Sequence, residues 1–131
     1  MLKKREKNKQ KNDNTILVEF VVEDYRFLKM YKSLIGKLLK DEVSKYLSAF
    51  NFHVSKIEEL MNKQNLKIVD LSGKVYDEGL SVNPLNIEDF GKDDKLIIDQ
   101  ILEPLIISTI DGAIVKSGTV MLKKCEEEKG E

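Results

Sequence analysis

The sequence predicts an α+β protein, in which a helical N-terminal stalk or bundle precedes a small, mostly antiparallel β-roll domain. Two observations support this fold class. Apolar residues recur at helical spacing up to Met61, and short β-branched runs separated by turn residues follow from Leu66 onward. The change of period falls within residues 57–80, where an amphipathic helix leads into a strand, a Ser72-Gly73 turn and a Tyr-Asp pair. The length of 131 residues fits one domain or two small subdomains.

The chain divides into four predicted segments: a disordered basic tail (1–15), a helical dimerisation region (16–65), a β domain (66–124) and an acidic tail (125–131). The first segment is rich in Lys, Asn and Gln and has almost nothing to bury, which predicts disorder. Its basic run could also serve as an arm for an anionic surface, but no aromatic or Arg-rich pattern supports that. Residues 16–22 have the composition of a strand, and they fit equally well as an apolar lead-in to the following helix.

Two apolar stripes run through the helical region, and they are out of phase across Lys40–Glu42. This shift predicts two helices or a bend rather than one continuous rod. Ser55 and Glu58 match a capping box, so a further break is expected within residues 51–55. Helices this short cannot bury both of their faces, and a second copy of the chain would cover the excess. The residues predicted to form such a dimer are Leu34, Leu38, Phe50, Ile57 and Leu60.

The β domain is predicted from β-branched runs bounded by turn residues. The runs are Leu66–Val69, Leu96–Ile98, Leu105–Ile107, Ala113–Val115 and the segment from Gly118 to Leu122. Asp111-Gly112 lies between two of these runs and is the strongest local signal for a β-hairpin.

Composition and motifs give no indication of an enzyme. Hydrophobic residues make up 41% and charged residues 34% of the chain, and the net charge is −1, so no overall field favours nucleic acid or membrane. The one histidine, His53, lies on an apolar stripe and is expected to pack or to join an interface rather than to catalyse. The carboxylate pairs at 88–89 and 93–94 are expected in solvated loops, although a pocket that gathered them would suit a small acid/base enzyme.

Cofactor and metal sites are not predicted either. The chain has a single cysteine, Cys125, and no cluster of zinc ligands or Gly-rich phosphate loop. The single cysteine and the absence of a signal-peptide pattern or a long apolar run lead us to expect a cytoplasmic protein without cofactor or metal.

From Val43, where the second apolar stripe begins, to Lys124, somewhat more than half of its length, the chain resembles GrpE, the nucleotide exchange factor of DnaK-type chaperones. The family follows its last bundle helix with a short strand, a Gly turn and a Phe/Tyr-Asp pair, and it closes with a hairpin turn and a final strand. Asp111-Gly112 stands at that turn and residues 114–120 stand in that strand. The residues that stand in the order of the earlier elements are Leu60, Leu66, Ile68, Asp70, Gly73, Tyr76 and Asp77.

The chain also departs from the family pattern. Ser81–Pro84 replaces an element that contains His-Glu, Ala113 replaces a basic residue, and Lys116-Ser117-Gly118 replaces Arg-Pro-Ala. A divergent paralogue that serves its own ATPase would account for these differences.

The resemblance implies a homodimeric co-chaperone that binds the nucleotide domain of a DnaK-type ATPase, promotes ADP release and catalyses no reaction. The residues that the resemblance offers for this contact are Lys116, Asp111, Gly112 and Ile106, and Lys116 occupies the family's basic position. The alternative is a structural interaction module, in which a helical dimer stalk displays a β domain without any chaperone.

Overall fold

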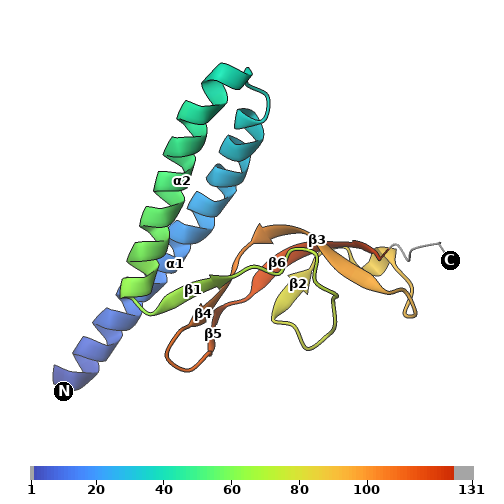
Figure 1. Cartoon of the computed structure of the whole chain (residues 1–131). Helices are drawn as coiled ribbons and strands as arrows, with labels where there is room; N and C mark the ends of the chain where they lie inside the picture. The colour runs from blue at the N-terminus through green and yellow to red at the C-terminus, as the bar shows by residue number, and fades with distance from the viewer. Residues whose placement is uncertain (1, 126–131) are drawn as a thin grey trace. The chain divides into compact units, whose positions relative to one another are not determined.

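The computed structural model describes residues 2–125, with side chains from residue 14 onward, and confirms the α+β arrangement (Figure 1). The chain forms two compact units, Met1–Lys67 and Ile68–Glu131. The first unit contains the helices α1 (Leu2–Ile35) and α2 (Lys40–Lys63). Of the predicted acidic tail, all but Cys125 lies outside the described residues.

Helix α1 begins at Leu2, so the prediction of a disordered tail over residues 1–15 is wrong for the backbone of the described part. The segment has no Gly or Pro, and its Lys, Arg, Glu and Gln residues are good helix formers, so a helix can extend through a stretch that has few apolar residues. Residues 16–22 also belong to this helix, which resolves the two readings of that segment in favour of the helical one.

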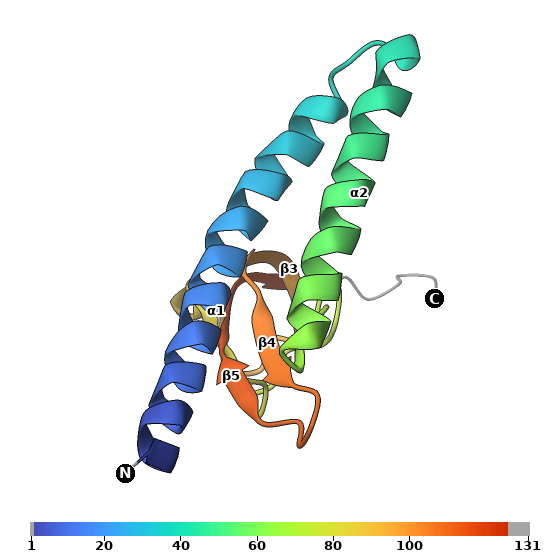
Figure 2. The same cartoon turned by 90° about the vertical axis from the view of Figure 1, so that its left-hand side faces the viewer.

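Helix α2 lies beside α1 and runs in the opposite direction, and the views in Figures 1 and 2 agree on this. The break between the helices covers residues 36–39, so two helices form, as one reading of the phase shift predicts. The expected break within residues 51–55 is wrong, because α2 continues through it. Asp41 and Glu42 lie in its first turn, where negative charge favours the helix dipole, and Asn65 follows its end with a φ of 58°.

An aromatic row and one charged pair join the two helices. The ring of Tyr31 on α1 stacks on Phe27 of the same helix and on Phe50 of α2, with centroids 6.4 and 6.2 Å apart. One turn further along the pair, Nε2 of His53 lies 2.9 Å from the Asp24 carboxylate, whose side chain is only 12% exposed. His53 therefore lies between the two helices, where its ring is a hydrogen-bond partner for the nearly buried carboxylate of Asp24.

Replacing His53 with alanine should destabilise the helical unit, because it leaves the Asp24 carboxylate without this partner. We expect a loss of about 1 kcal/mol, at the lower end for a buried unsatisfied group, since the His53 side chain is 43% exposed. Urea unfolding followed by circular dichroism measures the loss. Lys56→Ala is the control, because Lys56 forms its ion pair with Glu59 of its own helix, at 3.6 Å, and both side chains are exposed to solvent. Equal losses in the two variants would contradict a role for the Asp24–His53 pair.

The β unit is built from two three-stranded sheets. One has the order β1-β4-β5, with β1 (Leu66–Val69) spanning the boundary between the units, β4 (Leu105–Ser108) in the centre and β5 (Ile114–Lys116) at an edge. The other has the order β2-β6-β3, formed by Val82–Pro84, Gly118–Lys124 and Leu96–Glu103.

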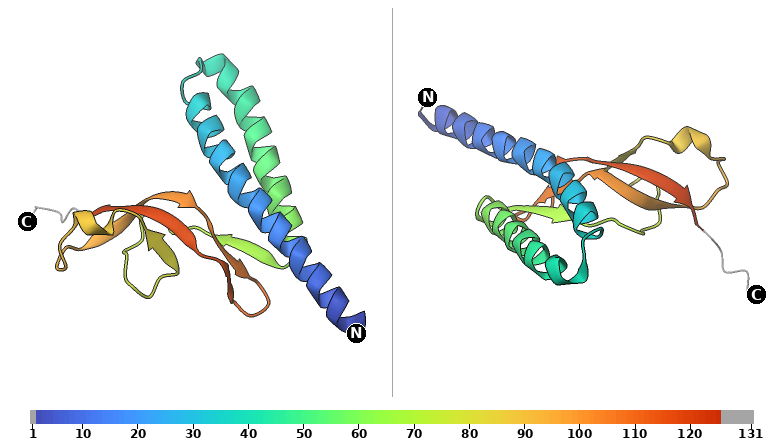
Figure 3. Two further views of the ribbon diagram at one scale, coloured as in Figure 1. Left: turned by 180° about the vertical axis from the view of Figure 1, so that it is seen from behind. Right: turned by 90° about the horizontal axis from the view of Figure 1, so that it is seen from above.

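The long antiparallel pair of β3 and β6 forms the main ladder of this unit (Figure 3). The parallel strand β2, which pairs with β6, was not predicted from the sequence. The buried apolar side chains of the unit come mainly from β3, β4 and β6 and include Leu96, Ile98, Ile101, Leu105, Ile106, Val120 and Leu122. The described segment between β2 and β3 also holds the short 3-10 helix η1 (Ile87–Asp89).

The chain crosses between the two sheets three times: from β1 to β2 through residues 70–81, and twice more through single residues. Pro104 joins β3 to β4, and Ser117 joins β5 to β6. Gly118 lies beside the last crossing, and a Cβ there would come within 3.4 Å of the Glu103 carbonyl oxygen and the Leu105 nitrogen. Glycine therefore fits best where the two backbones approach each other, because a larger residue would push these neighbours apart by a few tenths of an ångström.

The residues that carry the GrpE resemblance at the start of the β unit shape turns. The backbone N–H of Ser72 donates to the Asp70 carboxylate at 3.0 Å, and this bond, with a further one from the Ser72 hydroxyl, lowers the pKa of Asp70 below its usual 3.8. Gly73 follows with a φ of 76°, a conformation that favours glycine. The N–H of Tyr76 donates to the Leu96 carbonyl at 2.9 Å, which ties this segment to β3.

Candidate functional site: the β4–β5 hairpin

The predicted hairpin at Asp111-Gly112 is present, and it joins β4 to β5 in antiparallel pairing. The Asp111 carboxylate accepts the N–H of Ala113 at 3.0 Å, and the N–H of Ser108 donates to the Ala113 carbonyl at 2.8 Å. Gly112 has a φ of 72° and donates its N–H to Ser108. Asp111 and Gly112 therefore shape the tip of the hairpin, while both remain exposed to solvent.

A β-bulge in β5 brings consecutive apolar side chains to the surface. Ile106 pairs with Lys116 and Ile107 pairs with Ile114, so Val115 is the extra residue on its strand. Ile114 is 47% and Val115 is 43% exposed, and Ile110 near the tip is 77% exposed. We call Ile110, Ile114 and Val115 the exposed trio. The sequence analysis did not single out these residues, although the β-branched pair beside a hairpin turn was a visible signal.

Ile106 does not belong to this surface. Its side chain is completely buried at 0% exposure, so it forms part of the core under the hairpin and is not available to a partner. The central position of β4 in its sheet explains the error, because both Leu105 and Ile106 are buried there, and the strand becomes half-buried only after them.

Lys116 has internal partners rather than a free charge. Its Nζ lies 3.2 Å from Oε1 of Glu103 and donates to the Ser117 carbonyl at 2.8 Å. The same Glu103 oxygen accepts the hydroxyl of Thr119 at 2.9 Å. The side chains of Lys116 and Glu103 are only 30% and 23% exposed, so this ion pair is partly shielded from solvent.

The residues predicted to form a dimer differ in their exposure to solvent. Leu38, Phe50 and Ile57 are half-buried, and Phe50 packs on Tyr31. Leu34 is 59% and Leu60 is 38% exposed. The helical unit thus brings only part of the predicted set to its surface.

A longer apolar seam on α1 was missed by the sequence analysis. Its members recur at spacings of about three and four residues, the heptad pattern of a coiled coil, with Glu23 at one position of the repeat. The side chains of this seam are at least half exposed: Ile16 65%, Phe20 54%, Phe27 64%, Met30 74% and Leu34 59%. The earlier interpretation of residues 16–22 as a strand or lead-in hid the first half of the repeat.

A second surface of the β unit contains one carboxylate from each of the pairs at 88–89 and 93–94. A pocket of about 760 Å³ is lined by residues of the 76–78 segment, of η1 and of the loop before β3, among them Glu88 and Asp94. The Asp94 carboxylate accepts the N–H of Gly91 at 2.8 Å, and Lys92 and Lys95 share the same lining. Asp94 therefore shapes a loop, and we assign no acid/base chemistry to this pocket.

Residues with metal-ligating side chains do not converge in the described part of the chain, where no group of three or more could hold an ion. Neither described helix combines the length and the apolar character that crossing a membrane requires. No family model, curated protein or solved structure matches the chain. The β4–β5 hairpin, with its exposed trio, is therefore the candidate site that we develop from its own geometry.

Proposed function

We propose that this protein is a non-catalytic, cytoplasmic co-chaperone that binds the nucleotide domain of a DnaK-type ATPase and promotes ADP release. The observation that carries the proposal is the exposed trio of the β4–β5 hairpin. Three large apolar side chains on one short hairpin, two of them brought out by a bulge, are typical of a protein-binding surface. Their location in the hairpin to which the GrpE resemblance assigns partner contacts is what directs the proposal to a DnaK-type ATPase.

The mechanism requires only differential binding. A protein that binds the open nucleotide cleft more tightly than the closed cleft shifts the ATPase toward the open form, from which ADP escapes. A preference of about 3 kcal/mol would raise the open fraction roughly a hundredfold when that fraction is small. The protein needs no catalytic group for this, only a surface held in a defined position.

Binding measured against each nucleotide state tests the proposal. We expect the protein to bind nucleotide-free DnaK-type ATPase from the same organism roughly a hundredfold more tightly than the ADP-bound form, by isothermal titration calorimetry. Equal affinity for the two forms would exclude exchange, because a ligand without differential affinity shifts no equilibrium. Binding that is independent of nucleotide would instead favour the alternative of a structural interaction module.

We propose in addition that the α1 seam pairs two copies of the chain. Five exposed apolar residues occupy heptad positions on α1. Such a seam packs against a second helix that carries the same repeat, and a second copy of this chain provides one. Self-association of this kind also agrees with the family resemblance, and the seam supports it better than the residues that the sequence analysis selected.

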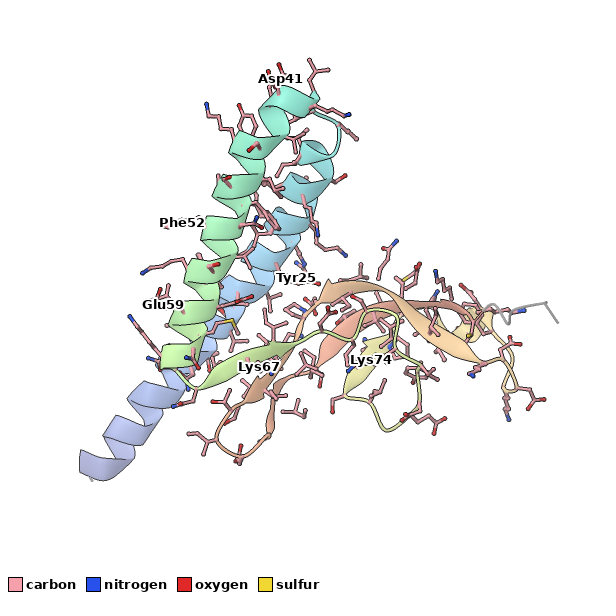
Figure 4. All side chains as sticks on the ribbon, in the orientation of Figure 1. Tyr25, Asp41, Phe52, Glu59, Lys67 and Lys74 are labelled. Atoms are coloured by element: carbon pink, nitrogen blue, oxygen red, sulfur yellow. The ribbon has the colours of Figure 1, made fainter. Side chains whose placement is uncertain are left out.

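Phe20→Glu should weaken this dimer at least about tenfold, because it places a charge in an apolar seam. Sedimentation equilibrium of the full chain at micromolar concentration measures the change. The matched control is Phe52→Glu, since Phe52 is 75% exposed and points away from α1 on the far side of α2 (Figure 4). A wild-type chain that sediments as a monomer, or a control that dissociates equally, would contradict pairing through the seam.

A further inference from the structure

The β4–β5 hairpin is attached to the rest of its unit as an arm with two narrow links. We define the arm as residues 105–116. It leaves β3 through Pro104 alone and returns to β6 through Ser117 alone. Because these links are short, non-covalent contacts set the position of the arm against the β2-β6-β3 sheet: the pairing of β4 with β1, the buried side chains of Leu105 and Ile106, and contacts across the links.

The ion pair between Glu103 and Lys116 connects the two chain segments that lead into the links. Glu103 is the last residue of β3 and Lys116 is the last residue of β5, so each directly precedes its link. Oε1 of Glu103 holds Nζ of Lys116 at 3.2 Å and the Thr119 hydroxyl at 2.9 Å, so it joins the arm to both long strands of the other sheet. The second bond of Lys116, to the Ser117 carbonyl at 2.8 Å, fixes the ammonium over the link itself.

We propose that Lys116 is a positioning residue: its ion pair with Glu103 holds the base of the arm against the β2-β6-β3 sheet, which stabilises the folded arm and so presents the exposed trio to a partner in one orientation. The benefit for the partner rests on the proposed function, but the restraint on the arm does not. Lys116 then affects binding through Ile114 and Val115, which follow one another directly before it on β5, rather than through its own charge.

Hydrogen exchange of the full chain tests the restraint without any partner. In Lys116→Met and Glu103→Gln, we expect the Ser108 amide of the arm to exchange about fivefold faster, the effect of losing about 1 kcal/mol of local stability. The Leu122 amide, which donates to Asn86 within the other sheet, should exchange at its wild-type rate. The charge-swapped variant Glu103→Lys with Lys116→Glu should recover most of the protection of Ser108.

The control is Lys123→Met, which removes another lysine that pairs across β3 and β6, with Asp99 at 3.6 Å, but spans no link. It should leave Ser108 unchanged. The proposal is overturned if the two single variants leave Ser108 unchanged, if they accelerate Ser108 and Leu122 equally, or if the charge swap restores nothing.

Binding to the ATPase provides the second readout. Lys116→Met and Glu103→Gln should weaken binding by similar factors, and Lys116→Met should leave its salt dependence as in the wild type. A loss confined to Lys116→Met, with a reduced salt dependence, would identify a direct charge contact and overturn the positioning role. If the wild-type protein binds no DnaK-type ATPase, the proposed function fails, and the exchange rates still decide whether the ion pair restrains the arm.

Discussion

Ile106→Ala is expected to destabilise the β unit by about 2–5 kcal/mol, the cost of truncating a large apolar side chain in a packed core. Ile106 is completely buried in the central strand of its sheet, so the truncation removes contacts and leaves a cavity. Since a whole domain is stable by only about 5–15 kcal/mol, the variant should unfold at a much lower denaturant concentration. Urea unfolding of the full chain, with tyrosine fluorescence or circular dichroism as the signal, measures the difference.

The hairpin supplies a matched control for this prediction. Ile110→Ala removes the same atoms four residues further along, at a side chain that is 77% exposed, and it should change stability by less than about 0.5 kcal/mol. Similar losses in the two variants would show that Ile106 is not a core residue. It would then again be a candidate for the partner contact that the sequence analysis assigned to it.

The double variant Ile114→Asp, Val115→Asp is expected to abolish binding to the DnaK-type ATPase while the β unit remains folded. Apolar anchors at the centre of an interface often contribute 2 kcal/mol or more, and placing two carboxylates there adds the cost of desolvating them. We expect the dissociation constant to rise more than about a hundredfold. Calorimetric titration of the variant against the nucleotide-free ATPase measures the rise.

Leu85→Asp is the matched control, because Leu85 is a comparably exposed apolar residue of the same unit, at 56%, and lies outside the hairpin. It should bind like the wild type. Loss of binding in both variants would point to a general effect of added negative charge, and wild-type binding by the double variant would remove the hairpin from the interface.

The β strands could be predicted from the sequence because their signals are local. The β-branched runs and the Asp111-Gly112 turn specify β1, β3, β4 and β5 through backbone preference and short-range pairing. Strand β2 has no comparable signal. It exists because residues 82–84 pair with β6, more than thirty positions later in the chain, and such pairing is set by tertiary contacts.

The beginning of α1 shows that amino-acid composition alone does not distinguish a disordered tail from a polar helix. The composition of residues 1–15 predicts a disordered tail because few of them are apolar, but the same residue types favour a helix once the following turns provide a nucleus. That error also concealed the α1 seam, since a heptad repeat becomes visible only when residues 16–34 belong to one helix.

For the candidate site, the sequence located the hairpin itself, but it did not show the structural role of each side chain in it. Asp111 and Gly112 shape the turn, Ile106 is core, and Lys116 is paired with Glu103. The bulge that exposes Ile114 and Val115 depends on the register in which β5 pairs with β4. A shift of that register by one residue would turn the side chains of the strand to the opposite face of the sheet. Such a register cannot be read from the residue types of either strand alone.

The release rate of fluorescently labelled ADP from the DnaK-type ATPase of the same organism, followed by stopped-flow as this protein is added, tests the central claim most directly. The account predicts a release rate that rises with the concentration of the protein, saturates, and reaches roughly a hundred times the spontaneous rate. It also predicts that the Ile114→Asp, Val115→Asp variant leaves the spontaneous rate unchanged while Leu85→Asp accelerates release like the wild type. A release rate that stays at the spontaneous value at saturating wild-type protein would contradict the claim that this protein is an exchange factor.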